Sequence, residues 1–174
     1  SRLLTIAVRA PYTLEWGGYK WYDFLEMGKP EPRMFKESCD KLSDFVDDVS
    51  LHYPVDQRQL YLLGFSMGTV MSLAMALSAP QRFRGVVANS GYLAENTHLE
   101  YRWNEVNALG FFVAHGLYDQ VIPVQASRII KEKLDAAKAR VDYHEYPMAH
   151  EIGQQSLSDM ARWLSQQIDG AKSM

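Results

Sequence analysis

The sequence has very little cysteine, since Cys39 is the only one in 174 residues. A single thiol excludes an internal disulfide framework and is typical of a reducing compartment, so we expect a cytoplasmic protein. The net charge of -3 provides no basic surface for nucleic-acid binding, which depends on released counterions. No apolar run approaches the roughly 18 residues that a membrane-spanning helix needs, so no integral membrane segment is predicted.

The composition is typical of a globular protein, with 47% hydrophobic and 22% charged residues. Strand-like runs alternate with helix-like patterns, which predicts a single α/β domain with a mostly parallel sheet flanked by helices. Residues 9–32 and 90–107 are predicted to be irregular. The predicted strands are 3–8, 59–65, 85–89, 110–114 and 141–146, and the predicted helices are 34–52, 67–78, 124–139 and a closing helix over 157–168.

The pentapeptide Gly64-Phe65-Ser66-Met67-Gly68 lies between a predicted strand and a predicted helix. This pattern is typical of a nucleophile elbow, a sharp turn that holds a serine hydroxyl clear of the backbone. We expect Gly64 and Gly68 to be required because side chains two residues before and after the serine would collide. The following helix would direct free N–H groups at a developing oxyanion.

Two later strands end in loops that contain the partners a serine nucleophile needs. Asp119 follows the predicted strand 110–114, and His150 follows the predicted strand 141–146. A serine hydroxyl needs an imidazole to take its proton and a carboxylate to orient that imidazole. The chain order Ser66, Asp119, His150 is the order found in α/β-hydrolases.

Other histidines and carboxylates compete for these roles. Glu145 and Glu151 are too near His150 along the chain to lie opposite it, and Asp142 begins a strand at the far end. Cys39 lies on the apolar stripe of a helix and is interpreted as a core residue. The remaining histidines have structural interpretations: His52 as a helix cap, His98 as a solvated loop residue or part of the site's mouth, His115 as a residue that orders the aspartate loop, and His144 as part of a strand.

Three separated motifs together resemble the carboxylesterase/phospholipase family of α/β-hydrolases, which includes acyl-protein thioesterases and small bacterial serine esterases. The motifs are Gly64–Gly68, His115-Gly116…Asp119…Pro123 and Met148…His150-Glu151. The segment Arg9-Ala10-Pro11, with Gly18-Tyr19-Lys20-Trp21-Tyr22-Asp23 after it, is similar to the family's aromatic loop beside the acyl pocket. The resemblance implies triad roles for Ser66, Asp119 and His150, with the Met67 backbone N–H as one oxyanion donor.

The chain departs from the family pattern in two respects. Met67 and Thr69 stand where several members have glutamine and a second glycine. The family's second oxyanion donor comes from a His-Gly loop after an earlier strand, and neither precedes Leu3. We therefore predict an N-terminally incomplete fold, in which a further upstream segment supplies a central strand and the second donor. The alternative is that residues 3–8 pair directly with 59–65 and leave a smaller sheet.

The predicted function is cleavage of carboxylic esters by a serine esterase that uses no cofactor and no metal, with thioesters or lysophospholipids as alternative substrates. Trp21, Tyr22, Tyr92 and Leu93 are candidates for the apolar acyl wall and could equally be core residues. The alternative function is a catalytically weak or inactive hydrolase-fold protein that binds an acyl or other small apolar ligand. The expected partner is a small ester substrate, and a homodimer is left open.

Overall fold

The computed structural model describes residues 3–26, 28–95 and 97–170. The chain divides into two compact units, one formed by residues up to 57 with 94–99 and the other by 58–93 with residues from 100 onward. The second unit contains all three motifs that carried the predicted chemistry.

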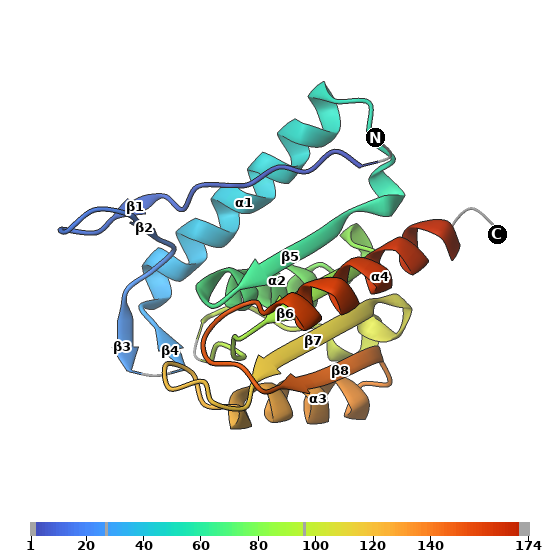
Figure 1. Cartoon of the computed structure of the whole chain (residues 1–174). Coiled ribbons are helices and arrows are strands. Elements are labelled where there is room, and N and C mark those ends of the chain that lie inside the picture. Colours follow the sequence, from blue (N-terminus) through green and yellow to red (C-terminus); the bar gives the residue numbers. More distant parts are fainter. Residues whose placement is uncertain (1–2, 27, 96, 171–174) are drawn as a thin grey trace. The chain divides into compact units, whose positions relative to one another are not determined.

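A four-stranded parallel sheet forms the centre of the second unit (Figure 1). Its strands are β5 (Tyr61–Phe65), β6 (Gly85–Asn89), β7 (Gly110–Gly116) and β8 (Arg140–Tyr146), in that spatial order. The register pairs Phe65 with Asn89, Asn89 with Ala114 and Ala114 with His144, so the carboxyl ends of all four strands meet at one edge. Every residue of β6 and β7 is buried, which explains why continuous apolar runs predicted these strands.

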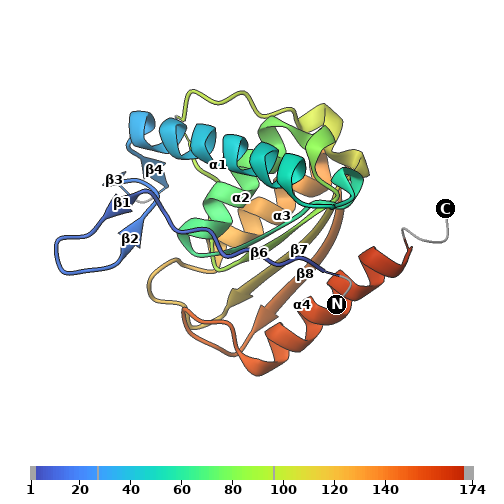
Figure 2. The same ribbon diagram turned by 90° about the horizontal axis from the view of Figure 1, so that it is seen from above.

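Helices cover both faces of this sheet, with α2 (Met67–Ser78) and α3 (Gln125–Ala136) on one face and α4 (Gln154–Gly170) on the other (Figure 2). Helix α2 is buried from Thr69 to Leu77 and is apolar on all sides, as expected for a helix inside the fold. Beneath α4, Trp163 and Met160 pack with Phe112, Val87 and Tyr146 in one apolar cluster. Short 3₁₀ turns precede the strands β5, β6 and β7, at Gln57–Gln59 (η1), Pro80–Arg82 (η2) and Trp103–Ala108 (η3).

The first unit consists of helix α1 (Pro32–His52) and two small antiparallel hairpins. Helix α1 begins two residues before the predicted start at residue 34, because Glu31 caps it by accepting hydrogen bonds from the N–H groups of Arg33 (3.2 Å) and Met34 (2.8 Å). The hairpins lie inside the segment that was predicted to be irregular. They pair β1 (Tyr12–Thr13) with β2 (Tyr19–Lys20), and β3 (Phe24–Glu26) with β4 (Lys29–Pro30).

The predicted strand over residues 3–8 is wrong, because this segment forms no strand and joins no sheet in the described part of the chain. Its apolar side chains are exposed instead of buried between helices, which removes the basis of a buried-strand assignment. The sheet therefore has β5 as one edge among the described residues. The upstream segment with a central strand stays a prediction. No helix of the described residues is both long and apolar enough to cross a membrane.

Candidate active site

Ser66 occupies a strained turn between β5 and α2, as predicted. Its backbone angles are φ 54° and ψ -123°, a region that residues with a side chain rarely adopt. The turn is held because the Ser66 N–H donates to the Asn89 carbonyl (3.0 Å) and the Thr69 hydroxyl donates to the same oxygen (2.6 Å). Helix α2 begins at Met67, so the Met67 N–H belongs to the first turn, where backbone donors have no intrahelical acceptor.

The two glycines of the motif differ in their steric role. A Cβ added at Gly64 would overlap backbone atoms of Gly68 and Thr69, which confirms that no side chain fits there. A Cβ added at Gly68 would meet no atom within 4 Å outside its chain neighbours and the backbone of its own helix, so the predicted collision at this position is wrong. The close approach of strand and helix is therefore accommodated at Gly64 alone.

This difference supplies a matched pair of variants. Gly64→Ala is expected to lower the free energy of unfolding by about 1–3 kcal/mol, the range for an overpacked site whose neighbours are backbone atoms. Gly68→Ala is expected to leave it unchanged or raise it by about 0.5–1 kcal/mol, because alanine favours helix over glycine. Urea denaturation of both variants measures the difference. Equal destabilisation by the two substitutions would contradict the steric account.

Asp119 and His150 are in direct contact, as predicted. His150 Nδ1 lies 2.7 Å from Asp119 Oδ2, and because a carboxylate only accepts, Nδ1 carries the hydrogen. Two backbone hydrogen bonds join their loops, from Leu117 N to Tyr146 O (2.8 Å) and from Tyr118 N to Met148 O (3.0 Å). The loops thus hold the acid and the imidazole as one unit.

The second oxygen of the Asp119 carboxylate is also fixed. Asp119 Oδ1 accepts hydrogen bonds from the N–H groups of Val121 (2.9 Å) and Ile122 (2.8 Å). Burial favours the neutral acid, but the hydrogen bonds from His150 and from these two N–H groups outweigh it and lower the pKa of Asp119 below its usual range. The group is therefore ionised at neutral pH and can orient an imidazole.

The His150 ring also approaches the nucleophile turn. Its centroid lies 4.8 Å from the ring centroid of Phe65, the residue immediately before Ser66. Ser66, Asp119 and His150 follow β5, β7 and β8 respectively, so all three lie at the carboxyl edge of the sheet. Open α/β sheets bind their ligands at this edge.

The other histidines have the structural contacts expected of them. His52 Nδ1 lies 2.8 Å from the Asp48 carbonyl in the last turn of α1, which confirms the cap. His144 stacks on Tyr146 and lies 2.8 Å from Asp142, which confirms a structural role for the histidine in β8. His98 is exposed. His115 is fully buried, and its Nε2 lies 2.8 Å from the Ile122 carbonyl, which confirms that it orders the aspartate loop.

The rejected acids and the cysteine are engaged elsewhere. Arg128 binds Glu145 through two hydrogen bonds of 2.7 and 2.8 Å, and this contact lowers the pKa of Glu145 to about 2. Cys39 is buried in the first unit, and burial raises the pKa of its thiol to about 12. A thiol with this pKa is almost never a thiolate at neutral pH, so the interpretation as a core residue is confirmed.

The four candidates for the acyl wall divide between the two units. Tyr22 is fully buried and packs edge-on against Phe24 and Phe35, so it belongs to the core of the first unit. Trp21 is half-buried, and its carbonyl accepts a hydrogen bond from Ser38. In the second unit, Tyr92 is buried and Leu93 is half-buried, in the segment that follows β6. Their roles toward a substrate stay predictions.

The sequence pattern did not reveal a second strained residue, Ser90, beside the nucleophile elbow. Ser90 directly follows β6, has φ 46°, and its buried hydroxyl has no hydrogen-bond partner among the described residues. A Cβ at the next residue, Gly91, would overlap the Thr69 side chain, so this segment packs tightly on the start of α2. The Ser90-Gly91 pair was the only local signal, and it lay in a segment assigned to a loop.

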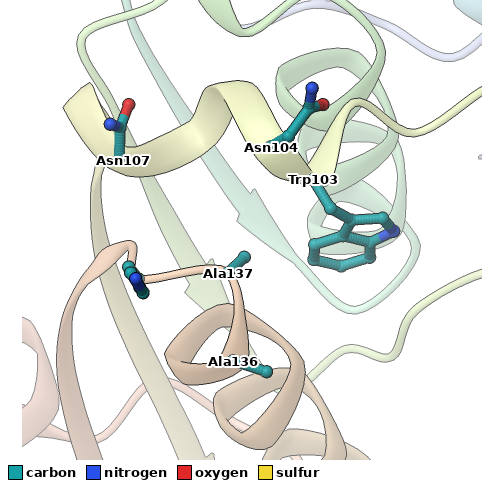
Figure 3. A pocket seen from close by; sticks show the side chains of 6 residues that line it. Trp103, Asn104, Asn107, Ala136 and Ala137 are labelled. Atoms are coloured by element: carbon teal, nitrogen blue, oxygen red, sulfur yellow. The ribbon is translucent and has the colours of Figure 1, made fainter.

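A surface hollow of about 390 Å³ lies elsewhere on the second unit (Figure 3). Its lining comes from η3, directly before β7, and from the end of α3, directly before β8, so it is near the amino ends of these strands. It contains Trp103, Asn104, Asn107, Ala136, Ala137 and Lys138, none of which is a candidate nucleophile or imidazole. Within the described residues, no group of three or more His, Cys, Asp or Glu side chains is arranged to hold a metal ion.

Comparison with known proteins shows the family of this chain. A model of the phospholipase/carboxylesterase family matches residues 4–168. The chain belongs to this family. It is 26% identical over 172 residues to acyl-protein thioesterase 1 of Yarrowia lipolytica, which covers 93% of this chain and 75% of that protein. It is 23% identical over 159 residues to a probable carboxylesterase of Arabidopsis thaliana, covering 88% and 61% respectively.

Solved structures share the fold of this family member. The carboxylesterase of Bacillus cereus superposes with a TM-score of 0.79 at 19% identity and covers 91% of this chain and 73% of that one. The carboxylesterase of Mesorhizobium loti gives 0.80 at 16% identity, covering 90% and 73%. The fold is therefore of the α/β-hydrolase type, as the motifs implied. Family membership implies hydrolysis of an ester or thioester bond.

Proposed function

We propose that the protein is a serine hydrolase that cleaves carboxylic esters through an acyl-serine intermediate. The observation that carries this proposal is the 2.7 Å contact between His150 Nδ1 and the ionised Asp119, at the sheet edge where Ser66 occupies a strained turn. This contact leaves His150 Nε2 as the unprotonated nitrogen, which is the one that a serine base needs.

The reaction follows from these three groups. His150 Nε2 accepts the proton of the Ser66 hydroxyl as its oxygen attacks the acyl carbon, and Asp119 stabilises the imidazolium that forms. The tetrahedral intermediate collapses when the bond to the leaving group breaks and Nε2–H protonates that group. Water then attacks the acyl-serine with His150 again as base, releasing the carboxylic acid and restoring the Ser66 hydroxyl.

The oxyanion requires donors at the start of α2. We assign the Met67 N–H to this role because it directly follows Ser66 in the first helical turn, where the helix dipole favours negative charge. Only the backbone of Met67 is used, so methionine in place of the family's glutamine leaves the donor intact. The second oxyanion donor stays a prediction.

The substrate class follows from the surroundings of Asp119. Leu117, Tyr118 and Val121 flank this residue on its loop and are 41%, 65% and 56% exposed. Exposed apolar side chains beside the reacting groups favour an apolar acyl or alcohol part. The Yarrowia lipolytica relative is named a thioesterase and the Bacillus cereus structure a carboxylesterase, so thioesters are tested alongside oxygen esters.

Reaction with a fluorophosphonate probe tests the proposal. Only an activated serine displaces fluoride from phosphorus, so we expect stoichiometric labelling of the peptide that contains Ser66. Ser66→Ala is expected to abolish labelling. Ser165→Ala, which changes an exposed serine of α4, is expected to leave it intact. An unlabelled wild-type protein that still binds apolar acids would instead identify a ligand-binding protein without turnover.

A further inference from the structure

His115 is a second imidazole beside the Asp119 carboxylate. Its side chain is completely buried, and its Nε2 lies 3.3 Å from Asp119 Oδ2, the oxygen that His150 also contacts. The mechanism above uses His150, and it gives His115 no part in the reaction beyond ordering the aspartate loop. A fully buried titratable ring against the carboxylate of the proposed triad requires an explanation.

The contacts of His115 determine which of its two ring nitrogens carries a hydrogen. Nε2 faces the Ile122 carbonyl at 2.8 Å and the Asp119 carboxylate at 3.3 Å, and both groups only accept, so Nε2 carries a hydrogen. Nδ1 is buried and has no hydrogen-bond partner within the described residues. A proton on Nδ1 would create a buried donor without an acceptor, which is unfavourable. Nε2 is therefore the nitrogen of His115 that donates a hydrogen bond.

This donor completes a ring of contacts around the aspartate loop. Asp119 Oδ1 accepts from the Ile122 N–H, while the Ile122 carbonyl accepts from His115. Gly116, between His115 and the loop, lies so close to the Met148 and Ala149 carbonyls that a Cβ would overlap them. The positions of the Asp119 loop and the His150 loop are thus coupled through β7 and its end.

We propose that His115 is a positioning residue for the reaction, whose Nε2–H donates to the Ile122 carbonyl and holds the loop so that the neighbouring Asp119 carboxylate stays aligned on His150. This inference rests on the proposed serine hydrolase function. The other charged groups around His115 are Glu145, its register partner on β8, and Arg128 of α3, which binds Glu145. That ion pair occupies the Glu145 carboxylate and leaves the Asp119 loop as the partner of His115.

Replacing His115 with glutamine or asparagine separates the hydrogen bond donated by Nε2 from the shape of the imidazole ring. The amide nitrogen of glutamine can occupy the position of Nε2, whereas that of asparagine reaches only to the position of Nδ1. We expect His115→Asn and His115→Leu to lower kcat about tenfold with KM unchanged, since positioning acts on the reacting groups, and His115→Gln to recover activity to within about threefold of wild type. Hydrolysis of a p-nitrophenyl ester and thermal unfolding are measured for each variant.

The pH dependence of kcat/KM distinguishes a positioning role of His115 from a purely structural role. In wild type kcat/KM rises as His150 becomes neutral. Weakening the Asp119–His150 contact destabilises the imidazolium, so the midpoint of this rise is expected to move to lower pH in His115→Asn and not in His115→Gln. A lower melting temperature with an unchanged midpoint and unchanged kcat would show a structural role only and overturn the proposal. So would a midpoint moved to higher pH.

NMR of the histidine ring nitrogens, in protein made with isotope-labelled histidine, tests the role of His115 without measuring turnover. We expect His115 to carry a hydrogen on Nε2, bonded to the Ile122 carbonyl, in wild type and in Ser66→Ala. A His115 ring whose Nε2 carries no hydrogen overturns the proposal. If no ester is hydrolysed but these NMR results hold, the proposed function fails while the placement of His115 beside Asp119 stands.

Discussion

Replacing Ser66 with alanine is expected to lower kcat by about 10⁵–10⁶-fold, the loss found when the nucleophile of a serine hydrolase is removed. The free energy of unfolding is expected to change little, because the Ser66 side chain makes no capping hydrogen bond to α2. The two effects are measured by hydrolysis of a p-nitrophenyl ester and by urea denaturation.

Ser66→Gly provides a control that separates strain from chemistry. At φ 54° and ψ -123° a side chain is strained by on the order of 1–3 kcal/mol, and glycine relieves this strain at some cost in chain entropy. We therefore expect Ser66→Gly to be as inactive as Ser66→Ala and about 1 kcal/mol more stable. A stable Ser66→Ala protein with turnover near wild type would exclude Ser66 as the nucleophile.

The parallel sheet was predictable because its central strands are buried on both faces. Strand β6 and helix α2 have the predicted boundaries, since an apolar run ends abruptly at a polar or glycine residue in each case. Strand β7 continues through His115 and Gly116, beyond the predicted end at residue 114. Polar side chains at the end of a buried strand do not continue the apolar pattern, so the sequence could not predict this extension.

The amino-terminal unit was predicted less well. An apolar run alone cannot distinguish a buried strand from an exposed extended segment, which is why residues 3–8 were misassigned. The two hairpins have strands of two or three residues, too short for any alternation to be visible. Positive φ angles at Gly17, Gly18 and Gly28 mark their turns, and these depend on the folded backbone.

The candidate site was predictable as far as its residue types and chain order. The Asp119–His150 pair follows from two motifs, whereas the two backbone donors on Asp119 Oδ1 depend on the path of the loop from Gly116 to Ile122. The same dependence applies to Gly68, which motif reasoning treated like Gly64. Contacts between loop backbones have no periodic signature in sequence, so they appear only when the fold brings the strand ends together.

Asp119→Asn is expected to lower kcat about 10⁴-fold, the loss measured for the corresponding substitution in a serine protease. The loop around Asp119 explains why an asparagine at this position cannot turn its amide oxygen toward His150. Two backbone N–H groups face Oδ1, so the amide oxygen of the introduced asparagine would occupy that position and its NH₂ group would face His150. The NH₂ group cannot accept from His150 Nδ1–H, so the imidazole would favour hydrogen on Nε2, the nitrogen that must take the Ser66 proton.

Neighbouring carboxylates provide the matched controls for this variant. Glu145→Gln removes an acid that is bound to Arg128, and Asp142→Asn removes one beside His144. Both are expected to keep kcat within about threefold of wild type, because surface ion pairs contribute little to structure. If Glu145→Gln abolished turnover while Asp119→Asn did not, the acid of the triad would be misassigned.

Acid unfolding provides a second measurement on Asp119→Asn that does not depend on turnover. The pKa of Asp119 is lowered in the folded protein, so its ionised form stabilises the fold above the usual carboxyl pKa, and this stabilisation is lost as pH falls from there through the lowered pKa of the folded state. Asparagine has no proton to gain. The variant is therefore expected to be less stable than wild type at neutral pH, with a difference that shrinks as the pH is lowered toward about 3. A difference that stayed constant with pH would show that Asp119 is not ionised against His150, and the mechanism would lose its acid.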